Sequence, residues 1–183
     1  MIDYKTFKKG YLNEWVDRSQ AARKAAEELA KKDTTSLRDK YRIILTLNGK
    51  QVEFKGENEK NPDDPKYNFF TYNEAVERFG QPDKDGWRLP TYEELEALID
   101  SYPYKFDKEG KQGIFDNRLY LPAAGYRYCN GNVYDVGFDS FYWSSTPEGS
   151  DYAWYLFFYS DSVHIYSDHR CCGQSVHLVR DVK

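Results

Sequence analysis

The sequence lacks the features that would place the protein in a membrane. It has no apolar run of 18 residues, and its opening, MIDYKTFKKG, has no apolar stretch of the kind found in signal peptides. The mean hydropathy of −0.86 is that of a water-soluble chain. We therefore expect a soluble protein without membrane insertion.

Cysteine and methionine are scarce, with three residues of the first and one of the second. An odd number of cysteines does not make a disulfide framework, and a chain of 183 residues can build a core without metal or disulfide support. The P-loop, G-x-G-x-x-G, H-E-x-x-H and G-x-S-x-G patterns are also absent. The sequence thus predicts no cofactor and no catalytic residue.

Basic charge is present but dispersed. Residues 1–56 carry 13 Lys+Arg against 8 Asp+Glu, whereas residues 57–183 carry 13 against 22. In the basic part, the Lys and Arg residues alternate with acids along a predicted helix, which is typical of a solvated helix face. We expect no nucleic-acid partner.

The first third of the chain reads as a helix and a hairpin. Residues 14–32 are rich in helix formers with an apolar stripe, and residues 41–54 place Asn48-Gly49, a type I′ turn signal, between two β-rich runs. Residues 57–67 are polar and contain proline, which predicts a loop. We therefore divide the chain into an N-terminal segment (1–56), this loop and a domain at 68–183.

Two short helices open that domain. Thr71 with Glu74, and Thr91 with Glu94, have the spacing of capping boxes, and Gly80 marks the end of the first helix. From Gly113 onward the pattern changes to short strands. In residues 154–159 the residues alternate, so Trp154, Leu156 and Phe158 should face the core and Tyr155, Phe157 and Tyr159 the opposite side.

Five sequence motifs follow one another in the domain: GWRLPTYEELEALI, LYLPAAGYR, YWSSTPEG, AWYLFF and GQSVHLVRDV. Together they resemble the domain shared by formylglycine-generating-enzyme-like proteins and the variable proteins of diversity-generating retroelements. The resemblance covers about residues 68–183, and His177 stands where the family usually has Arg. It implies an α+β fold: a C-type-lectin-like domain with short antiparallel strands and two helices, preceded by the helical and hairpin segment.

The enzymes of this superfamily bind copper through two cysteines that are several residues apart. Cys171 and Cys172 are adjacent, and neighbours on an extended strand point in opposite directions, so the oxidase chemistry is not expected here. His164, His169, Cys171 and Cys172 could form a zinc site, but no C-x-x-C spacing supports one. The calcium-binding signatures of lectins are missing. We predict no metal.

The composition from Tyr126 to Cys172 is unusual for a surface. The segment has no Lys, Gln or Met, and one Glu, Glu148, whereas Tyr, Ser, Asp, Gly and Asn are frequent. The resemblance implies a cause, because these retroelements scatter AAC codons at their adenines, and such codons cannot become Lys, Gln, Glu, Met or Trp. We therefore expect a variable region at about residues 120–183.

The alternating strands and the resemblance together predict a non-enzymatic ligand-binding face rich in rings, like an antibody paratope. The role implied is receptor recognition or adhesion towards a protein or glycan on a cell surface, by a protein of a phage particle or of the cytoplasm unless another route exports it. The predicted binding residues are Tyr128, Cys129, Tyr134, Asp135, Phe138, Asp139, Phe141, Asp151, Tyr152, Tyr155, Phe157, Tyr159, His164, Tyr166, Asp168, His169, Cys171 and Cys172.

Two alternatives remain at this point. One is an enzyme of the formylglycine-generating type or another metal-dependent enzyme. The other is a structural or assembly protein whose Tyr-rich face packs permanently against a partner. The outward rings of that face could also form a second core layer, covered by the N-terminal helices of the chain.

Overall fold

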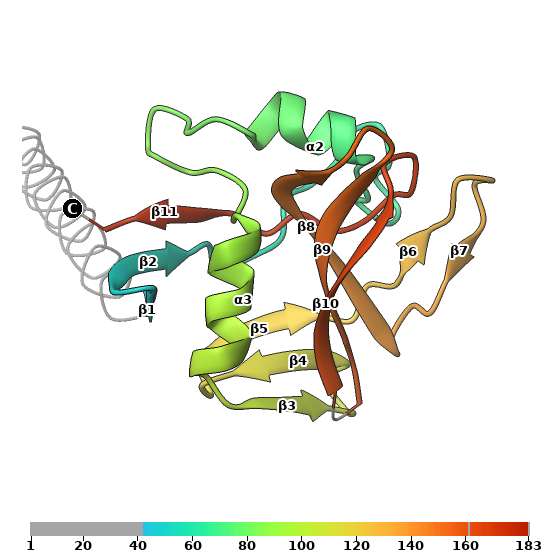
Figure 1. Cartoon of the computed structure of the whole chain (residues 1–183). Helices are drawn as coiled ribbons and strands as arrows, with labels where there is room; N and C mark the ends of the chain where they lie inside the picture. Colours follow the sequence, from blue (N-terminus) through green and yellow to red (C-terminus); the bar gives the residue numbers. More distant parts are fainter. Residues whose placement is uncertain (1–41, 161, 183) are drawn as a thin grey trace, which may run out of the picture. The chain divides into compact units, whose positions relative to one another are not determined.

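The computed structural model describes residues 42–160 and 162–182, nearly all of which belong to one unit of the chain that begins at Ile43 (Figure 1). The helix predicted at residues 14–32 lies outside the described residues. Within them the fold is α+β, as predicted. The helices are α2 (Tyr72–Phe79) and α3 (Tyr92–Ser101); the strands are β1 (Ile43–Leu47), β2 (Lys50–Phe54), β3 (Tyr104–Asp107), β4 (Gln112–Phe115), β5 (Leu119–Pro122), β6 (Tyr126–Arg127), β7 (Val133–Tyr134), β8 (Asp139–Glu148), β9 (Tyr152–Tyr159), β10 (Ser162–His169) and β11 (Val179–Asp181).

The predicted hairpin is present, and it belongs to the domain. Leu47 pairs with Lys50, so the loop consists of Asn48 and Gly49, both with the positive φ of a type I′ turn. Strand β11, from the end of the chain, pairs with β2 to give the sheet order β1-β2-β11. The loop at 57–67 therefore does not separate two units, since the strands on either side of it share one sheet.

Both helices begin where the sequence predicts, and α2 also ends there. Thr71 and Thr91 accept hydrogen bonds from the backbone N–H groups of Glu74 and Glu94, and each glutamate accepts one from its N-cap backbone. Gly80 caps α2 at its C-terminal end. Among the described residues, no helix has both the length and the apolar character that crossing a bilayer requires.

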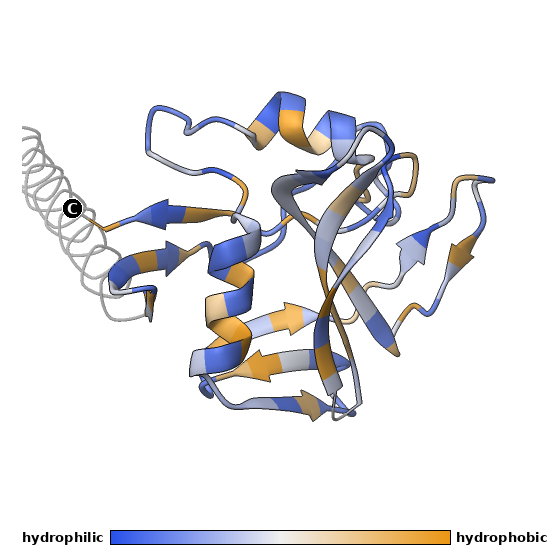
Figure 2. Ribbon diagram, in the orientation of Figure 1, coloured by the Kyte–Doolittle hydropathy of each residue, from blue (hydrophilic) through white to orange (hydrophobic). Residues whose placement is uncertain are grey.

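Three further antiparallel sheets complete the domain: β3-β4-β5, β10-β9-β8 and the short pair β6-β7. The larger core cluster lies among α3, the hairpin, β3–β5 and one side of β8–β10, with Leu98, Phe115, Leu156 and Phe158 all fully buried. Figure 2 shows long pale stretches on β8–β10, because Tyr, Trp and Ser have intermediate hydropathy.

The C-terminal segment from Cys172 to Val179 is buried along its length, although only Val179–Asp181 forms a strand. Its backbone exchanges pairs of hydrogen bonds with Phe70, with Arg127 and with Arg88. It also bonds to β8, since Ser175 donates to Phe141 O and accepts from Trp143 N. The phrase GQSVHLVRDV is thus a structural segment that holds distant parts of the chain together.

The tryptophans differ more than the sequence suggested. Trp143 is fully buried, and its indole N–H donates to Phe70 O at 2.9 Å. Trp154, which was expected to face the core, is only partly buried, and so is Trp87. The Arg180 guanidinium lies 4.4 Å from the ring centroid of Trp87, and the Tyr92 ring lies 5.1 Å from that of Trp154. These two partly buried rings therefore pack against a guanidinium group and another ring.

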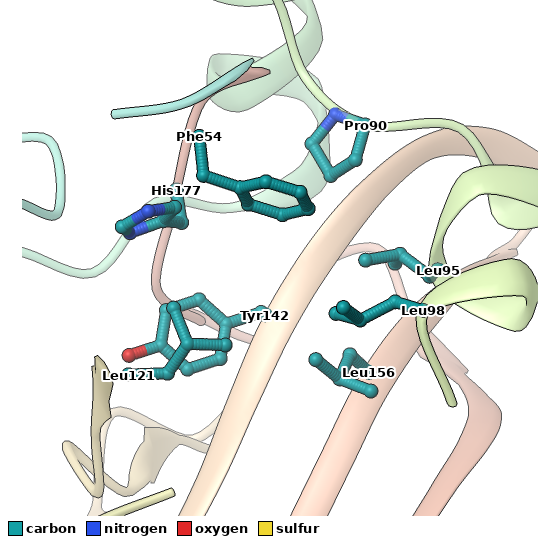
Figure 3. Close-up of a pocket in the computed structure, with 8 residues that line it drawn as sticks. All are labelled: Phe54, Pro90, Leu95, Leu98, Leu121, Tyr142, Leu156 and His177. Carbon is teal, nitrogen blue, oxygen red and sulfur yellow. The ribbon is translucent and has the colours of Figure 1, made fainter. Parts of the chain in front are cut away.

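His177 is a buried titratable group beside a small apolar cavity of about 10 Å³ (Figure 3). Its Nδ1–H donates to Asn58 Oδ1 at 2.9 Å, while Nε2 is buried and has no hydrogen-bond partner among the described residues. Phe54, Leu121 and Tyr142 line the same cavity. Burial in these surroundings lowers the pKa of His177 to about 4.

This burial predicts a pH-dependent stability. The pKa of His177 in the folded protein, about 4, lies below the ordinary value of about 6.5. The contribution of this group to the free energy of unfolding is therefore complete above pH 6.5 and is lost as pH falls towards 4. The free energy of unfolding should fall by up to about 3 kcal/mol through this group alone. Denaturant unfolding at a series of pH values should show a flatter profile for His177→Gln than for wild type.

Exposed His164 provides the matched control, because its imidazole already contacts solvent in the folded protein. His164→Gln should keep the wild-type slope between pH 6.5 and 4. An unchanged slope in His177→Gln would show that the buried imidazole does not set this dependence.

Candidate ligand-binding face

One side of the β8–β10 sheet carries a connected row of rings. Phe141 of β8 pairs with Phe157 of β9, and Phe157 pairs in turn with His164 of β10. The ring centroids of Phe141 and Phe157 are 5.0 Å apart, and those of Phe157 and Tyr166 are 5.9 Å apart. Alternation along these strands places all these rings on the side opposite Leu156 and Phe158.

The β6–β7 pair extends this row beyond the sheet. Tyr126 lies with its ring centroid 4.4 Å from Phe141 and 5.7 Å from Tyr134. Tyr126 was not among the predicted residues, although it lies in the same biased segment. Figure 1 shows β6 and β7 beside β8–β10, so two separate sheets contribute to one aromatic face.

The exposure of the predicted residues divides them into three groups. Those exposed to solvent are Tyr128, Cys129, Tyr134, Asp135, Phe138, Asp151, Tyr152, Tyr159, His164, Tyr166, His169 and Cys171. Asp139, Phe157 and Asp168 are half-buried. Phe141, Tyr155 and Cys172 are buried at 7%, 8% and 0% exposure.

These three buried residues belong to a second core cluster instead of the surface. Phe141 and Tyr155 stack with centroids 5.6 Å apart, and Tyr155 lies edge-on to Trp143. Burial raises the pKa of the Tyr155 hydroxyl. The inner part of the aromatic row therefore belongs to a second core layer, while its outer part reaches solvent. The N-terminal helices that the sequence analysis considered as a cover for such a layer lie outside the described residues.

An apolar groove of about 450 Å³ lies at one end of the aromatic face. It is lined by Phe106, Lys108, Lys111, Gly137, Phe138, Asp139, Tyr159 and Ser160. Burial and the negative charge of Asp135 raise the pKa of the Asp139 carboxyl. No sequence signal pointed to Lys108 and Lys111, because the β3–β4 turn reaches the groove only through the tertiary fold.

A second hollow, of about 410 Å³, is more polar. This polar pocket is lined by Asn73, Ser150, Asp151, Tyr152, His169, Arg170 and Cys171. The Tyr152 hydroxyl and His169 Nε2 are 3.1 Å apart, and Arg170 donates to the carbonyl oxygens of Tyr152 and Gly149. Arg170 thereby fixes the backbone around the pocket and leaves hydroxyl, carboxylate and imidazole groups at its wall.

The cysteines are arranged differently from the sequence prediction. Cys129 and Cys171 form a disulfide, with their Cα atoms 5.1 Å apart, and Cys172 is a buried free thiol. Burial raises the pKa of the Cys172 thiol to about 12. The expectation that neighbouring cysteines point apart fails because they lie in a turn, where Cys172 N–H donates to His169 O.

The potential ligand group for a metal also differs from the one considered from sequence. Among the described residues, Cys129, Cys171 and Cys172 bring their sulfur atoms within 4.8 Å of one another. His164 and His169 do not belong to this group. The three sulfur atoms are brought together by the fold, since Cys129 follows β6 and the other two cysteines follow β10.

An α+β domain that exposes clustered rings beside two hollows has the construction of a ligand-binding module. The chain belongs to the Lcl C-terminal domain family, whose model matches residues 20–180. This is a C-type-lectin-like domain found in the variable proteins of diversity-generating retroelements, and it is generally a non-enzymatic binding domain. The match begins before the hairpin, in agreement with the shared β1-β2-β11 sheet. No curated protein and no solved structure matches the chain.

Gly125 sets the position of the β6–β7 part of the face. It has a φ of +72°, and a Cβ here would meet Tyr134 O and, at 2.7 Å, Val136 N. Gly125→Ala should therefore destabilise the fold by about 3 kcal/mol, through both the positive φ and the backbone contact. Thermal or denaturant unfolding measures the loss.

Gly131 is the matched control, because it has a φ of +89° in the same region of the chain, but a Cβ added there would meet no atom within 4 Å. Gly131→Ala should cost about 1 kcal/mol, for the positive φ alone. Equal losses in the two variants would show that the contact with the β7 backbone has no effect.

Proposed function

We propose that the chain is a non-enzymatic receptor-recognition or adhesion protein, with a C-type-lectin-like fold and a ligand-binding face that a retroelement diversifies. One observation carries this proposal. All the exposed large hydrophobic side chains among the described residues fall between Tyr120 and Tyr166, inside the region predicted to vary; they are Tyr120, Tyr128, Tyr134, Val136, Phe138, Tyr152, Tyr159 and Tyr166.

The exposure of these rings supports binding because a folded domain seldom leaves so many in water without use. Phe138 is 73% exposed and Tyr166 48%. Tyrosine rings supply contact area at little cost in conformational entropy, and neighbouring Ser, Asn and Asp residues supply adaptable hydrogen bonds. The exposed aromatic residues from Tyr128 to Tyr166 are then the anchors, and the acids around them refine specificity.

The buried rings restrict which residues can contact a ligand. Phe141, Tyr155 and Cys172 hold the second core layer, so they would support the face from below instead of touching a partner. Phe157, half-buried, lies between this layer and exposed Tyr159 and Tyr166, with ring centroids 5.4 and 5.9 Å away. A rigid layer beneath the exposed rings reduces the entropy lost on binding.

The apolar groove is lined partly by residues outside the region predicted to vary and partly by residues within it. Phe106 and Lys108 come from the β3–β4 hairpin, outside the region predicted to vary, whereas Phe138 and Tyr159 come from within it. The groove would accept an apolar group of a protein or glycan ligand, with the ammonium groups beside it favouring an acidic neighbour. The side chains of the polar pocket would form hydrogen bonds with the ligand.

The diversification part of the proposal is tested in the surrounding DNA. We expect a near-copy of the segment that encodes about residues 120–183, differing mainly at adenines and lying near a reverse transcriptase gene. Sequencing of the locus in independent isolates should show substitutions at those adenines. Isolates whose differences are spread evenly over all bases and over residues 42–183 would contradict it.

The binding part is tested by single alanine substitutions. Phe138→Ala and Tyr166→Ala should each weaken binding to the host cell surface at least tenfold, because exposed aromatic anchors dominate such interfaces. Tyr120→Ala is the matched control: Tyr120 is 47% exposed, but it lies on β5, outside the β8–β10 sheet and the β6–β7 pair, and its hydroxyl donates to Asn117 O. Flow cytometry with the labelled protein measures all three variants, and equal losses, or none, would contradict the assignment.

A further inference from the structure

The three cysteines of the chain form one cluster of sulfur atoms. Cys129 is bonded to Cys171, and the sulfur of Cys172 lies 3.4 Å from that of Cys129. All three sulfur atoms fall within 4.8 Å of one another. The disulfide joins two of these sulfur atoms, and the free thiol of Cys172 lies beside them. Reduction of the disulfide would therefore give a cluster of three thiols.

Backbone contacts hold the two cysteine-bearing segments together without help from the disulfide. Arg127 and Gly173 exchange two hydrogen bonds, of 2.8 and 2.7 Å, close to the cluster in both segments. Cys172 N–H donates to His169 O at 2.9 Å, which closes the turn that contains Cys171. Reduction therefore separates the bonded sulfur atoms but leaves the three side chains facing the same point.

This arrangement fits a tetrahedral zinc ion. A Zn–S bond of about 2.3 Å puts neighbouring sulfur ligands about 3.8 Å apart. The sulfur atoms of Cys129 and Cys172 are already 3.4 Å apart, whereas those of Cys129 and Cys171 are bonded and reach such a spacing only after reduction. Asp168, which is half-buried, interacts with the Cys172 thiol and accepts from Gln174 Nε2 at 3.4 Å. Its carboxylate does not belong to the group of three sulfur atoms, so it would have to move towards the ion to supply a fourth ligand. Cys129 and Cys171 are exposed and give the ion a route in.

We propose that the reduced protein binds one Zn²⁺ ion through Cys129, Cys171 and Cys172, with Asp168 in the fourth position, and that disulfide formation expels it. A dithiol or phosphine reductant delivers two electrons, which with two protons convert the disulfide into two thiols. The ion then displaces the protons of three thiols. Oxidation by a small disulfide returns two electrons to that oxidant and restores the Cys129–Cys171 bond.

The direct test uses the full chain in its two redox states. Protein reduced with a phosphine in the absence of oxygen is titrated with Zn²⁺ against a chromophoric chelator, beside the oxidised protein as control. We expect one equivalent bound by the reduced chain, with affinity at least 100-fold above that of the oxidised chain. Equal affinity in the two states, or no binding by the reduced chain, overturns the proposal.

A single substitution identifies the ligands. Cys171 is exposed, so we expect Cys171→Ser to retain the fold, and it should lower the zinc affinity of the reduced protein at least tenfold. Asp168→Asn should lower it less, and Asp100→Asn, an exposed acid on α3, should leave it unchanged. Co²⁺ should give a thiolate charge-transfer band with wild type that weakens in Cys171→Ser. Unchanged affinity and an unchanged band in Cys171→Ser would assign any bound ion to other groups and overturn the proposal.

Discussion

The buried C-terminal segment is the constraint on which the rest of the structure depends. Between Gly173 and Val179 its backbone bonds in turn to Arg127, Phe70, β8 and Arg88, and it also accepts from Glu59 and Lys55. These partners lie far apart in sequence, so the segment fixes the loop before α2, the approach to α3 and the start of the β6–β7 pair at once. Its apolar side chains fill both core clusters. Contacts between parts so distant in sequence raise the contact order of the domain, which slows folding.

The face depends on this closure through two supports. Trp143 is anchored to Phe70 O, and Phe141 and Tyr155 pack against it to form the layer under the exposed rings. Arg127, bonded to Gly173, also pairs with Asp64 at 2.7 Å and so ties β6 to the loop before α2. Because the core layer and the Arg127 contacts hold the backbone of the face, we expect its exposed side chains to contribute little to the stability of the fold. We therefore expect substitution there to change the surface and leave the fold intact, as the proposed diversified face requires.

Local patterns were sufficient for part of this structure. The two capping boxes, the Asn48-Gly49 hairpin and the alternation in β9 are short-range signals, and the structure confirms them. The features that the sequence analysis missed depend on contacts between residues far apart in the sequence. The sequence could not reveal that β2 pairs with β11, that Tyr155 packs beneath its neighbours, or that Lys108 reaches the groove. Adjacent Cys171 and Cys172 were misjudged because a strand was assumed where the chain turns. The family match, from residue 20 to 180, begins well before residue 68, where the resemblance seen in the sequence starts.

The central claim is that a constant core carries a changeable face, and two matched libraries test it most directly. One randomises exposed Tyr128, Tyr134 and Tyr166 with NNC codons, and the other randomises buried Phe141, Tyr155 and Cys172 in the same way. The measurement is the fraction of clones in each library that resists protease when displayed. The account predicts that most clones of the exposed library stay folded and that few of the buried library do. Equal folded fractions would contradict the division between core and face.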